Sequence, residues 1–247
     1  MRIWIQGESE MECFLRKRCE ENGMALSSLP DSEIVMLGFP YTKITKDLES
    51  CLSNKKGIIC GILDEETNQR FLSEDCILYQ PLKDEEYLQK NAELTAEGAI
   101  NAAMNRLPVA FQDISCLVIG YGRIGKALTR ILRSLGAEVT VAARKPESRK
   151  EAGDNSIATD RIQYAIGNKD LILNTVPFPV ISESGLLSIK NTAFLFELAS
   201  RPYGFDMTRA RKLGVHAVLE SGIPGRYCPA SAADNLFRYI ERSVQIE

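Results

Sequence analysis

The sequence predicts an α/β protein in which two parallel-sheet domains are joined by a long helix. Short apolar runs alternate with segments that carry apolar residues at helical spacing, which is the pattern of parallel sheets covered by helices. A helical stretch at residues 84–105 separates two groups of these elements, and a glycine-rich turn at residues 120–125 opens the second group. These features indicate a smaller N-terminal α/β domain followed by a larger one.

The N-terminal domain is expected over residues 1–87. It contains no glycine-rich phosphate-binding motif, so we expect it to form the substrate side of the protein. Gly23 follows a helix-spaced segment and is a typical helix end. The expected strands are 2–6, 34–39, 57–63 and 76–79, and the expected helices are 11–19 and 42–52.

The interdomain helix is expected at residues 88–110. Pro108 ends the helical pattern, because proline lacks the amide hydrogen that a helix interior requires. A helix that joins the two domains is expected to lie at their cleft. Its spacing of apolar and small residues predicts a buried face formed by Leu88, Ala92, Thr95, Ala99 and Ala103.

The second domain, residues 111–228, carries a dinucleotide-binding motif. The apolar run at 116–119 ends in Gly120-Tyr121-Gly122-Arg123-Ile124-Gly125, a Gly-x-Gly-x-x-Gly sequence. A helix-spaced segment follows at once, and residues 139–142 predict the next strand. This strand–turn–helix–strand order predicts a Rossmann-type doubly wound parallel sheet.

Each glycine of the motif has an expected role. Gly120 permits the tight turn, Gly122 lets the backbone approach a pyrophosphate, and Gly125 lets helix and strand pack closely. The N-terminus of the helix offers unpaired N–H groups to the phosphates. A glycine turn without a ligand is the alternative, but the strand–helix–strand context favours a nucleotide.

The other elements of this domain follow in order. Helices are expected at 159–166, 184–189 and 207–213, strands at 171–175, 193–198 and 215–219, and a rigid turn at 222–225. A C-terminal helix, within residues 229–247, is expected to pack back across both domains.

The end of the second strand indicates which nucleotide binds. An NAD site usually has an acidic residue there, on the ribose 2′-hydroxyl. Here Ala143 is followed by Arg144 and Lys145. Two cations attract a 2′-phosphate, so we expect NADP rather than NAD. The alternative is that both cations belong to a solvated loop.

Polar residues at three strand ends are candidates for binding. Ligands of open α/β sheets bind beyond the carboxyl ends of the strands. Arg201 precedes a proline, so its backbone is restrained, and its guanidinium can clamp a carboxylate. A structural salt bridge is the alternative for Arg201. The candidates are Thr175, Val176, Pro177, Gly222 for the nucleotide and Ser200, Arg201, Arg226 for a substrate.

The interdomain helix adds Asn91, Thr95 and Glu97 as candidates for the substrate site. A carboxylate in a closing cleft can act as an acid or base, although a surface charge is the alternative for Glu97. His216 is the only histidine, and it is expected to be structural because it lies within a strand. A histidine acid or a Ser-His-Asp triad is therefore not expected.

Composition excludes several classes of protein. The chain has 247 residues and a net charge of −3 without a basic block, so no nucleic-acid partner is expected. No apolar run approaches the ~20 residues of a membrane span, so no membrane partner is expected either. The 7 cysteines include no Cys-x-x-Cys pair, which argues against a zinc site and favours reduced thiols in the cytoplasm.

Four sequence blocks resemble the A-subunit family of dipicolinate synthase. Residues 91–100 are similar to the family's interdomain signature, and residues 120–125 to its glycine loop, including Arg123. Residues 197–206 and 222–226 also fit. The blocks fall in the family's order and cover about residues 88 to 240.

The resemblance implies an enzyme that forms pyridine-2,6-dicarboxylate, the spore calcium chelator, from a dihydrodipicolinate precursor. It implies a flavoprotein-like second subunit, NADP(H), and the cytoplasm of a sporulating bacterium. Arg201 and Arg226 are then expected to bind the carboxylates of a small cyclic dicarboxylate, and Glu97 to transfer a proton. We also expect a homo-oligomer and no metal.

The chain departs from the family pattern at several points. The N-terminal lobe is shorter, Tyr203 replaces a glycine, and Arg226 and Ala230 stand where the family usually has lysines. These departures leave two alternatives open. One is a nucleotide-binding subunit without chemistry of its own, and the other is a dehydrogenase of another small carboxylate.

Overall fold

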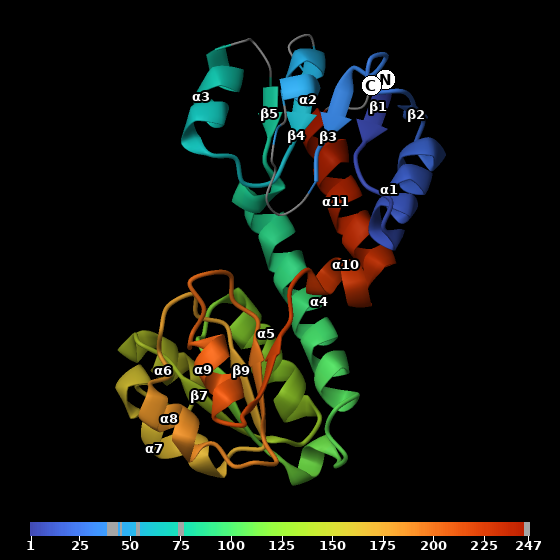
Figure 1. The fold of residues 1–247 in the computed structure, drawn as a ribbon. Coiled ribbons are helices and arrows are strands. Elements are labelled where there is room, and N and C mark those ends of the chain that lie inside the picture. The colour runs from blue at the N-terminus through green and yellow to red at the C-terminus, as the bar shows by residue number, and fades with distance from the viewer. Residues whose placement is uncertain (39–43, 45, 53–54, 74–76, 245–247) are drawn as a thin grey trace. The chain divides into compact units, whose positions relative to one another are not determined.

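The computed structural model describes residues 1–38, 44, 46–52, 55–73 and 77–244. The chain divides into two compact units, coloured along the chain in Figure 1. The N-terminal unit consists of Met1–Asn91 and Pro224–Glu247, and the central unit consists of Ala92–Ile223. The expected sequence of two α/β bodies is therefore present, and the chain returns to the first body at its end.

The N-terminal unit is built on a five-stranded parallel sheet of order β2-β1-β3-β4-β5. This order confirms the predicted parallel α/β domain. Strand β3 is buried along its length, because both faces of the sheet are covered. The strands are β1 (Arg2–Ile5), β2 (Ala25–Leu26), β3 (Ile34–Met36), β4 (Gly57–Ile59) and β5 (Ile77–Tyr79).

Among the described residues, the helices α1 (Glu10–Glu21), α2 (Lys46–Leu52) and α3 (Glu65–Ser73) lie between these strands, and the 3₁₀ turn η1 (Pro81–Lys83) follows β5. Helix α1 begins with a capping box between Ser9 and Glu12 and ends before Gly23, which has a φ of +81°. The parts of the predictions that fall on residues 39, 40, 42, 43, 45 and 76 lie outside the described residues.

The C-terminal helix α11 (Pro229–Val244) completes the core of the N-terminal unit, beside α1 in Figure 1. Leu236 and Ile240 are buried with Leu15 and Cys19 of α1 and Ile3 of β1. Arg18 of α1 forms an ion pair with Asp234 at 2.5 Å. The helix therefore belongs to the same hydrophobic core as the first strand.

The central unit is built on a six-stranded parallel sheet of order β11-β10-β9-β6-β7-β8. This is the doubly wound order, in which the chain winds outward in both directions from β6 and β9. It confirms the predicted Rossmann-type sheet. The strands are β6 (Ser115–Ile119), β7 (Glu138–Ala142), β8 (Ser156–Ile157), β9 (Leu171–Asn174), β10 (Phe194–Glu197) and β11 (His216–Leu219).

Helices flank this sheet and cover an almost entirely apolar core. One of them is α5 (Arg123–Ser134), which buries Ala127, Leu128 and Leu132. The others are α6 (Pro146–Ala152), α7 (Ile162–Ala165), α8 (Glu183–Ser188) and α9 (Met207–Lys212), with 3₁₀ turns η2 (Phe111–Asp113), η3 (Thr159–Arg161) and η4 (Ile166–Asn168).

Helix α4 (Glu85–Met104) matches the predicted helical stretch at 84–105, but it ends at Met104 and does not extend to residue 110, where the interdomain helix was expected to end. Four of the five residues expected on its buried face are buried, and Leu88 is half-buried. Small side chains at this face, such as Ala99 and Ala103, allow close packing along the helix. The helical spacing of small and apolar residues therefore correctly predicted the buried face of this helix.

Two element predictions are wrong. Residues 222–225 were expected to form a rigid turn, but helix α10 (Ile223–Tyr227) begins there. Pro224 is compatible with it, because the first turn of a helix needs no amide donor from the proline. The helix expected at 159–166 is divided into η3, α7 and η4.

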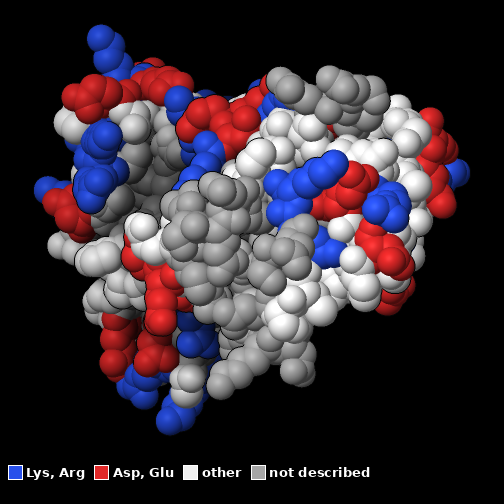
Figure 2. All heavy atoms as spheres, turned by 90° about the horizontal axis from the view of Figure 1, so that it is seen from above, with Lys and Arg blue, Asp and Glu red and all other residues white. Residues whose placement is uncertain are grey.

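Charged side chains of both signs are interspersed on the face shown in Figure 2. This distribution agrees with the small net charge of −3. Among the described residues, no helix is long and apolar enough to cross a membrane.

Candidate functional site

The glycine loop lies at the carboxyl end of β6, where the sheet order changes direction between β6 and β9. Gly120 has a φ of +97°, a conformation that favours glycine. A Cβ atom at Gly120 would lie closer than 3.0 Å to Oγ1 of Thr175 and to Cγ2 of Val176. Glycine is therefore required here by both backbone conformation and space.

Gly125 and Gly122 differ in what surrounds them. A Cβ atom at Gly125 would lie closer than 3.0 Å to the carbonyl oxygen of Gly120, so this glycine lets α5 pack against the loop. Gly122 is the N-cap of α5, and a Cβ atom there would meet nothing within 4 Å. The N-terminus of α5 is therefore exposed at Gly122. Its first turn contains no acidic residue that would repel an anion.

Thr175 ties the end of β9 to the end of β6. Its amide nitrogen and its hydroxyl both donate to the carbonyl oxygen of Ile119, at 2.9 and 2.8 Å. The predicted residues Gly120, Thr175 and Val176 are thus brought together at the switch point of the sheet. Ligands of doubly wound sheets bind at this place.

At the carboxyl end of β7, the second strand of the dinucleotide motif, two cationic residues follow and no acidic residue stands where an NAD site usually has one. Ala143 is buried, whereas Arg144 and Lys145 are exposed. Arg149 of α6 donates from Nη1 to the carbonyl oxygens of Ala143 and Arg144, at 3.0 and 2.8 Å. Sequence reasoning missed Arg149, which fixes the turn that displays Arg144. Arg149 lies about one helical turn after Pro146, and this spacing could have indicated that its side chain reaches back to the turn.

A buried amide–carboxylate pair joins β9 to β10. Asn174 and Glu197 are both fully buried, and they are register partners on neighbouring strands. The Nδ2 of Asn174 donates to Oε1 and Oε2 of Glu197 at 2.8 and 3.0 Å. Burial raises the pKa of Glu197, while N–H donors from Gly204, Asn174 and Ala199 act in the opposite direction.

Glu197 also holds the loop that carries Arg201. Its Oε1 accepts from the amide of Ala199 at 2.9 Å, and its Oε2 accepts from the amide of Gly204 at 2.8 Å. Ser200 and Arg201 are exposed on this loop, and the guanidinium of Arg201 lies 5.6 Å from the ring centre of Tyr203. The peptide bond between Arg201 and Pro202 is cis.

The sequence contained a signal for the Asn174–Glu197 pair that the prediction did not use. Two apolar strands, 171–174 and 194–197, each end in a polar residue that can hydrogen-bond. In adjacent parallel strands such ends meet at the same edge. Glu197 was noticed only as part of a family block, without a role.

The other predicted site residues are distributed over both units. In the central unit, the substrate candidates Glu97 and Thr95 are exposed and buried, respectively, on α4, and the nucleotide candidate Gly222 has a φ of +61°. Asn91 and Arg226 belong to the N-terminal unit, where the Arg226 guanidinium lies 5.2 Å from the ring centre of Tyr227. Their roles in binding or catalysis stay predictions.

His216 is the first residue of β11, at the end of the strand opposite to the candidate site. Its ring stacks on Phe194 with centroids 5.3 Å apart and an interplanar angle of 27°. This position agrees with the structural role expected for it. Among the described residues, no group of His, Cys, Asp and Glu side chains could hold a metal ion.

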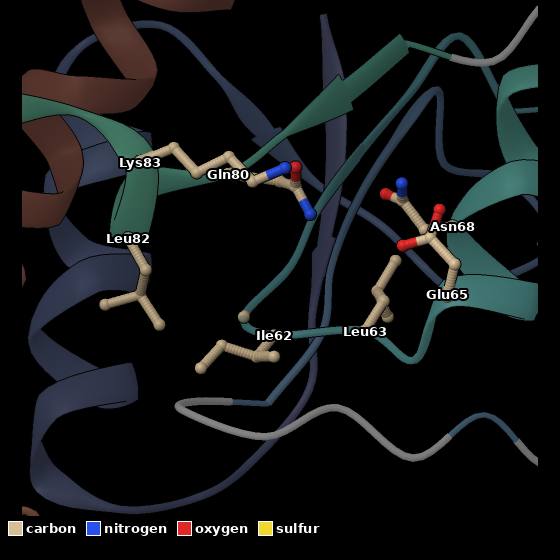
Figure 3. Close-up of a pocket in the computed structure, with 8 residues that line it drawn as sticks. Ile62, Leu63, Glu65, Asn68, Gln80, Leu82 and Lys83 are labelled. Atoms are coloured by element: carbon tan, nitrogen blue, oxygen red, sulfur yellow. The ribbon is translucent and has the colours of Figure 1, made fainter. Parts of the chain in front are cut away.

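The N-terminal unit contains a pocket of about 340 Å³ after the carboxyl ends of β4 and β5. In Figure 3 the polar ends of Gln80 and Lys83 face those of Asn68 and Glu65, and Ile62 and Leu63 lie below them. Ile62 is 52% exposed, which is high for a large apolar side chain. The pocket combines an apolar side with amide, amine and carboxylate groups, as small-molecule sites do.

Comparisons with known proteins agree with the geometry of the central unit. Residues 85–199 match the model of the D-isomer specific 2-hydroxyacid dehydrogenase, NAD binding domain. The chain is 30% identical over 151 residues to the A subunit of dipicolinate synthase from Bacillus subtilis (strain 168). The chain is thus similar both to this NAD-binding domain and to the A subunit of dipicolinate synthase.

The alignment with the B. subtilis protein covers 60% of this chain and 51% of that protein. The chain thus spans about half the length of the curated relative that it matches. The family model nevertheless indicates a nicotinamide nucleotide as cofactor, and with the relative it supports a dehydrogenase or related oxidoreductase. Neither comparison distinguishes NADP from NAD.

Solved structures extend the likeness to the whole chain. The A subunit of dipicolinate synthase from Bacillus halodurans has a TM-score of 0.86 at 20% identity and covers 100% of this chain and 98% of its own. The corresponding protein from Bacillus subtilis has a TM-score of 0.84 at 20% identity, covering 99% and 96%. A transhydrogenase from Sinorhizobium meliloti reaches 0.71 at 16% identity, covering 99% and 95%. At these identities the likeness shows the fold alone.

Proposed function

We propose that the chain is an NADP-dependent oxidoreductase of the dipicolinate synthase type. In this proposal it forms pyridine-2,6-dicarboxylate from dihydrodipicolinate, together with a flavoprotein-like second subunit, in the cytoplasm of a sporulating bacterium. The observation that carries the nucleotide part of the proposal is the crowding at Gly120 and Gly125, where a Cβ atom would lie closer than 3.0 Å to neighbouring atoms of the loop and of Thr175. The 30% identity to a dipicolinate synthase protein supports the choice of reaction.

The residues of the glycine loop fit a dinucleotide. The exposed N-terminus of α5 and the open space at Gly122 suit a pyrophosphate, because helix N-termini favour anions. Arg144 and Lys145 suit a 2′-phosphate, and Arg149 fixes their turn. When bound, the oxidised nucleotide supplies a hydride acceptor.

The substrate proposal assigns one role to each polar group. Arg201 binds a carboxylate of the ring beside Ser200, and Arg226 binds the other carboxylate. Glu97, which is exposed on α4, takes the proton that leaves the ring when a hydride is removed. The protein then mainly needs to orient the ring, because the aromatic product favours the reaction.

A reconstituted assay tests the proposal. The chain, the second subunit, dihydrodipicolinate and NADP are combined, and pyridine-2,6-dicarboxylate is measured by its absorbance and by mass spectrometry. We expect product with NADP and about tenfold less with equal NAD at low concentration. Absence of product with either nucleotide contradicts the proposed reaction.

The alternative of a non-catalytic nucleotide-binding subunit is favoured by two sequence observations: the shorter N-terminal lobe, and Ala230 at a position where the family usually has a lysine. The variants Arg201→Ala and Glu97→Gln separate the two functions. A catalytic chain loses turnover in both variants while it keeps NADP affinity. Unchanged turnover in both, with a stable complex of the two subunits, supports the non-catalytic role.

A further inference from the structure

The carboxylate of Glu197 is surrounded by N–H donors. It is 0% exposed, and its hydrogen-bond partners in the structure are Asn174 Nδ2 and the amides of Ala199 and Gly204. The three donors lie 2.8 to 3.0 Å from its two oxygens. A group that only accepts hydrogen bonds satisfies all of them, as an ionised carboxylate does.

The two backbone donors lie on either side of Arg201. Ala199 and Gly204 are the first and last residues of the segment 199–204, which bears Ser200 and Arg201 on its exposed side. Gly204 also accepts from the amides of Val180 and Ile181 through its carbonyl oxygen, at 2.8 and 3.0 Å. One carboxylate therefore fixes both ends of the segment that presents the arginine.

Asn174 connects this carboxylate to the nucleotide side of the site. Its Nδ2 donates to the carbonyl oxygen of Val176 at 3.0 Å, and its Oδ1 accepts from the amide of Val176 at 3.2 Å. Val176 lies against Gly120 of the glycine loop. The chain of contacts runs from Gly120 through Val176, Asn174 and Glu197 to the Arg201 segment.

We propose that Glu197, held by Asn174, is a positioning residue that fixes Arg201 for binding the substrate carboxylate beside the nucleotide. The inference deepens the proposed function and rests on it for the identity of the substrate. Glu197 acts through the segment 199–204 and does not itself contact substrate.

Space around Gly204 adds an independent argument. A Cβ atom at Gly204 would lie closer than 3.0 Å to Nδ2 and Cγ of Asn174 and 3.0 Å from its Oδ1, although the φ of Gly204 lies outside the positive range. The backbone of the segment thus packs directly on the Asn174 amide. Close packing on a hydrogen-bonded pair restricts the segment to one arrangement.

The main variant is Glu197→Gln, which keeps the size of the side chain but replaces one acceptor with an NH₂ donor. That donor would face the amide of Ala199 or Gly204, so one end of the segment loses its anchor. We expect the Kd for pyridine-2,6-dicarboxylate to rise about tenfold or more, and the Kd for NADP to change less than about threefold. Both are measured by calorimetry on the whole chain, after thermal unfolding has confirmed a cooperative fold.

Two comparisons distinguish positioning from a general structural role. In the Glu197→Gln background, Arg201→Ala should cost little further dicarboxylate affinity, because the two changes act on one interaction. The matched control is Glu220→Gln, a carboxylate that is 3% exposed at the end of neighbouring β11 and pairs with Arg106 at 3.2 Å. It should change the stability and leave the dicarboxylate Kd unaltered. A full, additive loss from Arg201→Ala in the Glu197→Gln background overturns the proposal.

The exchange Asn174→Asp with Glu197→Gln provides a second test if Glu197→Gln folds poorly. It restores a donor–acceptor pair between β9 and β10, but it leaves one amide of the segment unpaired and removes the hydrogen bond from Asn174 Nδ2 to the carbonyl oxygen of Val176. We expect it to recover part of the unfolding temperature without recovering dicarboxylate affinity. Recovery of both properties together overturns the positioning role.

Hydrogen exchange separates this inference from the proposed function. If the wild-type chain does not bind pyridine-2,6-dicarboxylate, the proposed substrate is wrong, and the amides of Ala199 and Gly204 are then compared in wild type and Glu197→Gln. Faster exchange at these two amides than in Glu220→Gln supports the fixed segment. Equal exchange in both variants rejects it.

Discussion

Gly120 is the residue at which conformation and space constrain the chain most tightly. Its φ of +97° disfavours any residue with a Cβ atom, and such an atom would also lie too close to Thr175 Oγ1. We expect Gly120→Ala to weaken NADP binding at least tenfold, because the loop must move away from the position that a pyrophosphate needs. Calorimetry with NADP, alongside thermal unfolding, measures both effects.

Gly214 is the matched control for this change. It also has a positive φ, +77°, but a Cβ atom there would meet nothing within 4 Å. Gly214→Ala should cost about 1–2 kcal/mol of stability through backbone strain and leave nucleotide affinity intact. Equal loss of NADP affinity in the two variants would show that strain elsewhere, and not the shape of the loop, governs binding.

Arg144 is the residue on which the choice of nucleotide depends. A hydrogen bond from a guanidinium to a 2′-phosphate contributes roughly 1.5–3 kcal/mol to the binding free energy, which is about a ten- to hundredfold difference in affinity. Arg144→Ala should weaken NADP binding by that factor and barely change NAD binding, and adding Lys145→Ala should enlarge the effect. Exposed Arg130 of α5 supplies the control, Arg130→Ala. Equal wild-type affinity for NAD and NADP contradicts the assignment.

Residue roles were predictable from the sequence where a motif fixes the spacing. Gly120 and Gly125 belong to a short contiguous pattern, so their constraints follow from local geometry alone. Asn174 and Glu197 are 23 residues apart and meet only because β9 and β10 pair in register. Their partnership depends on the strand order, which the sequence pattern does not specify to the residue.

Elements were predictable where they are long and periodic. Helix α4 and the strands β6, β7, β9 and β10 follow apolar patterns that span several residues. The two-residue strands β2 and β8 are too short to show a pattern, and they form because an adjacent strand supplies a partner. Proline and glycine at 222–225 suggested a turn, but both are tolerated in the first turn of a helix.

Helix α11 supports the N-terminal unit by burying one face against α1 and β1. Leu236 is 1% exposed, so Leu236→Ala should lower the unfolding free energy by about 2–5 kcal/mol. Arg238 is exposed on the same helix, and Arg238→Ala should change it by less than about 0.5 kcal/mol. Urea unfolding compares the two variants. A similar loss of unfolding free energy in Leu236→Ala and Arg238→Ala would mean that α11 does not contribute to this core.

The strand ends of the N-terminal unit are tied together by Glu33. Its carboxylate accepts from Lys56 Nζ at 2.6 Å and from the amide of Arg2 at 3.0 Å. The Lys56 hydrogen bond, followed by that from Arg2, lowers the pKa of Glu33 from 4.5 to about 2. Folding thus favours the ionised form, and its contribution to stability is present above about pH 4.5 and lost as the pH falls toward 2.

Glu33→Gln tests this linkage. The variant should be less stable than wild type at pH 7, and the difference should shrink as the pH is lowered from about 5 to about 3. The effect should also weaken at high salt, because the pair is partly exposed to solvent. Urea unfolding at several pH values measures it. A difference that stays constant with pH contradicts the assigned role.

On the scale of the whole molecule, two parallel sheets of different order are linked through α4, and the chain ends in the unit in which it began. The sequence indicated two α/β bodies, because apolar runs and helix-spaced segments alternate on both sides of α4. The strand orders were not predictable in the same way. They depend on which strands pair across the sheet, and the local pattern of each strand is compatible with several neighbours.

The central claim is that the glycine loop holds NADP while Arg201 holds a carboxylate of the substrate. A crystal structure of the chain soaked with NADP and pyridine-2,6-dicarboxylate tests both parts at once. The claim predicts the pyrophosphate at Gly120 to Gly122, the 2′-phosphate at Arg144, and a carboxylate within hydrogen-bonding distance of the Arg201 guanidinium. A nucleotide bound elsewhere, or a dicarboxylate that does not contact Arg201 while NADP is bound, would contradict it.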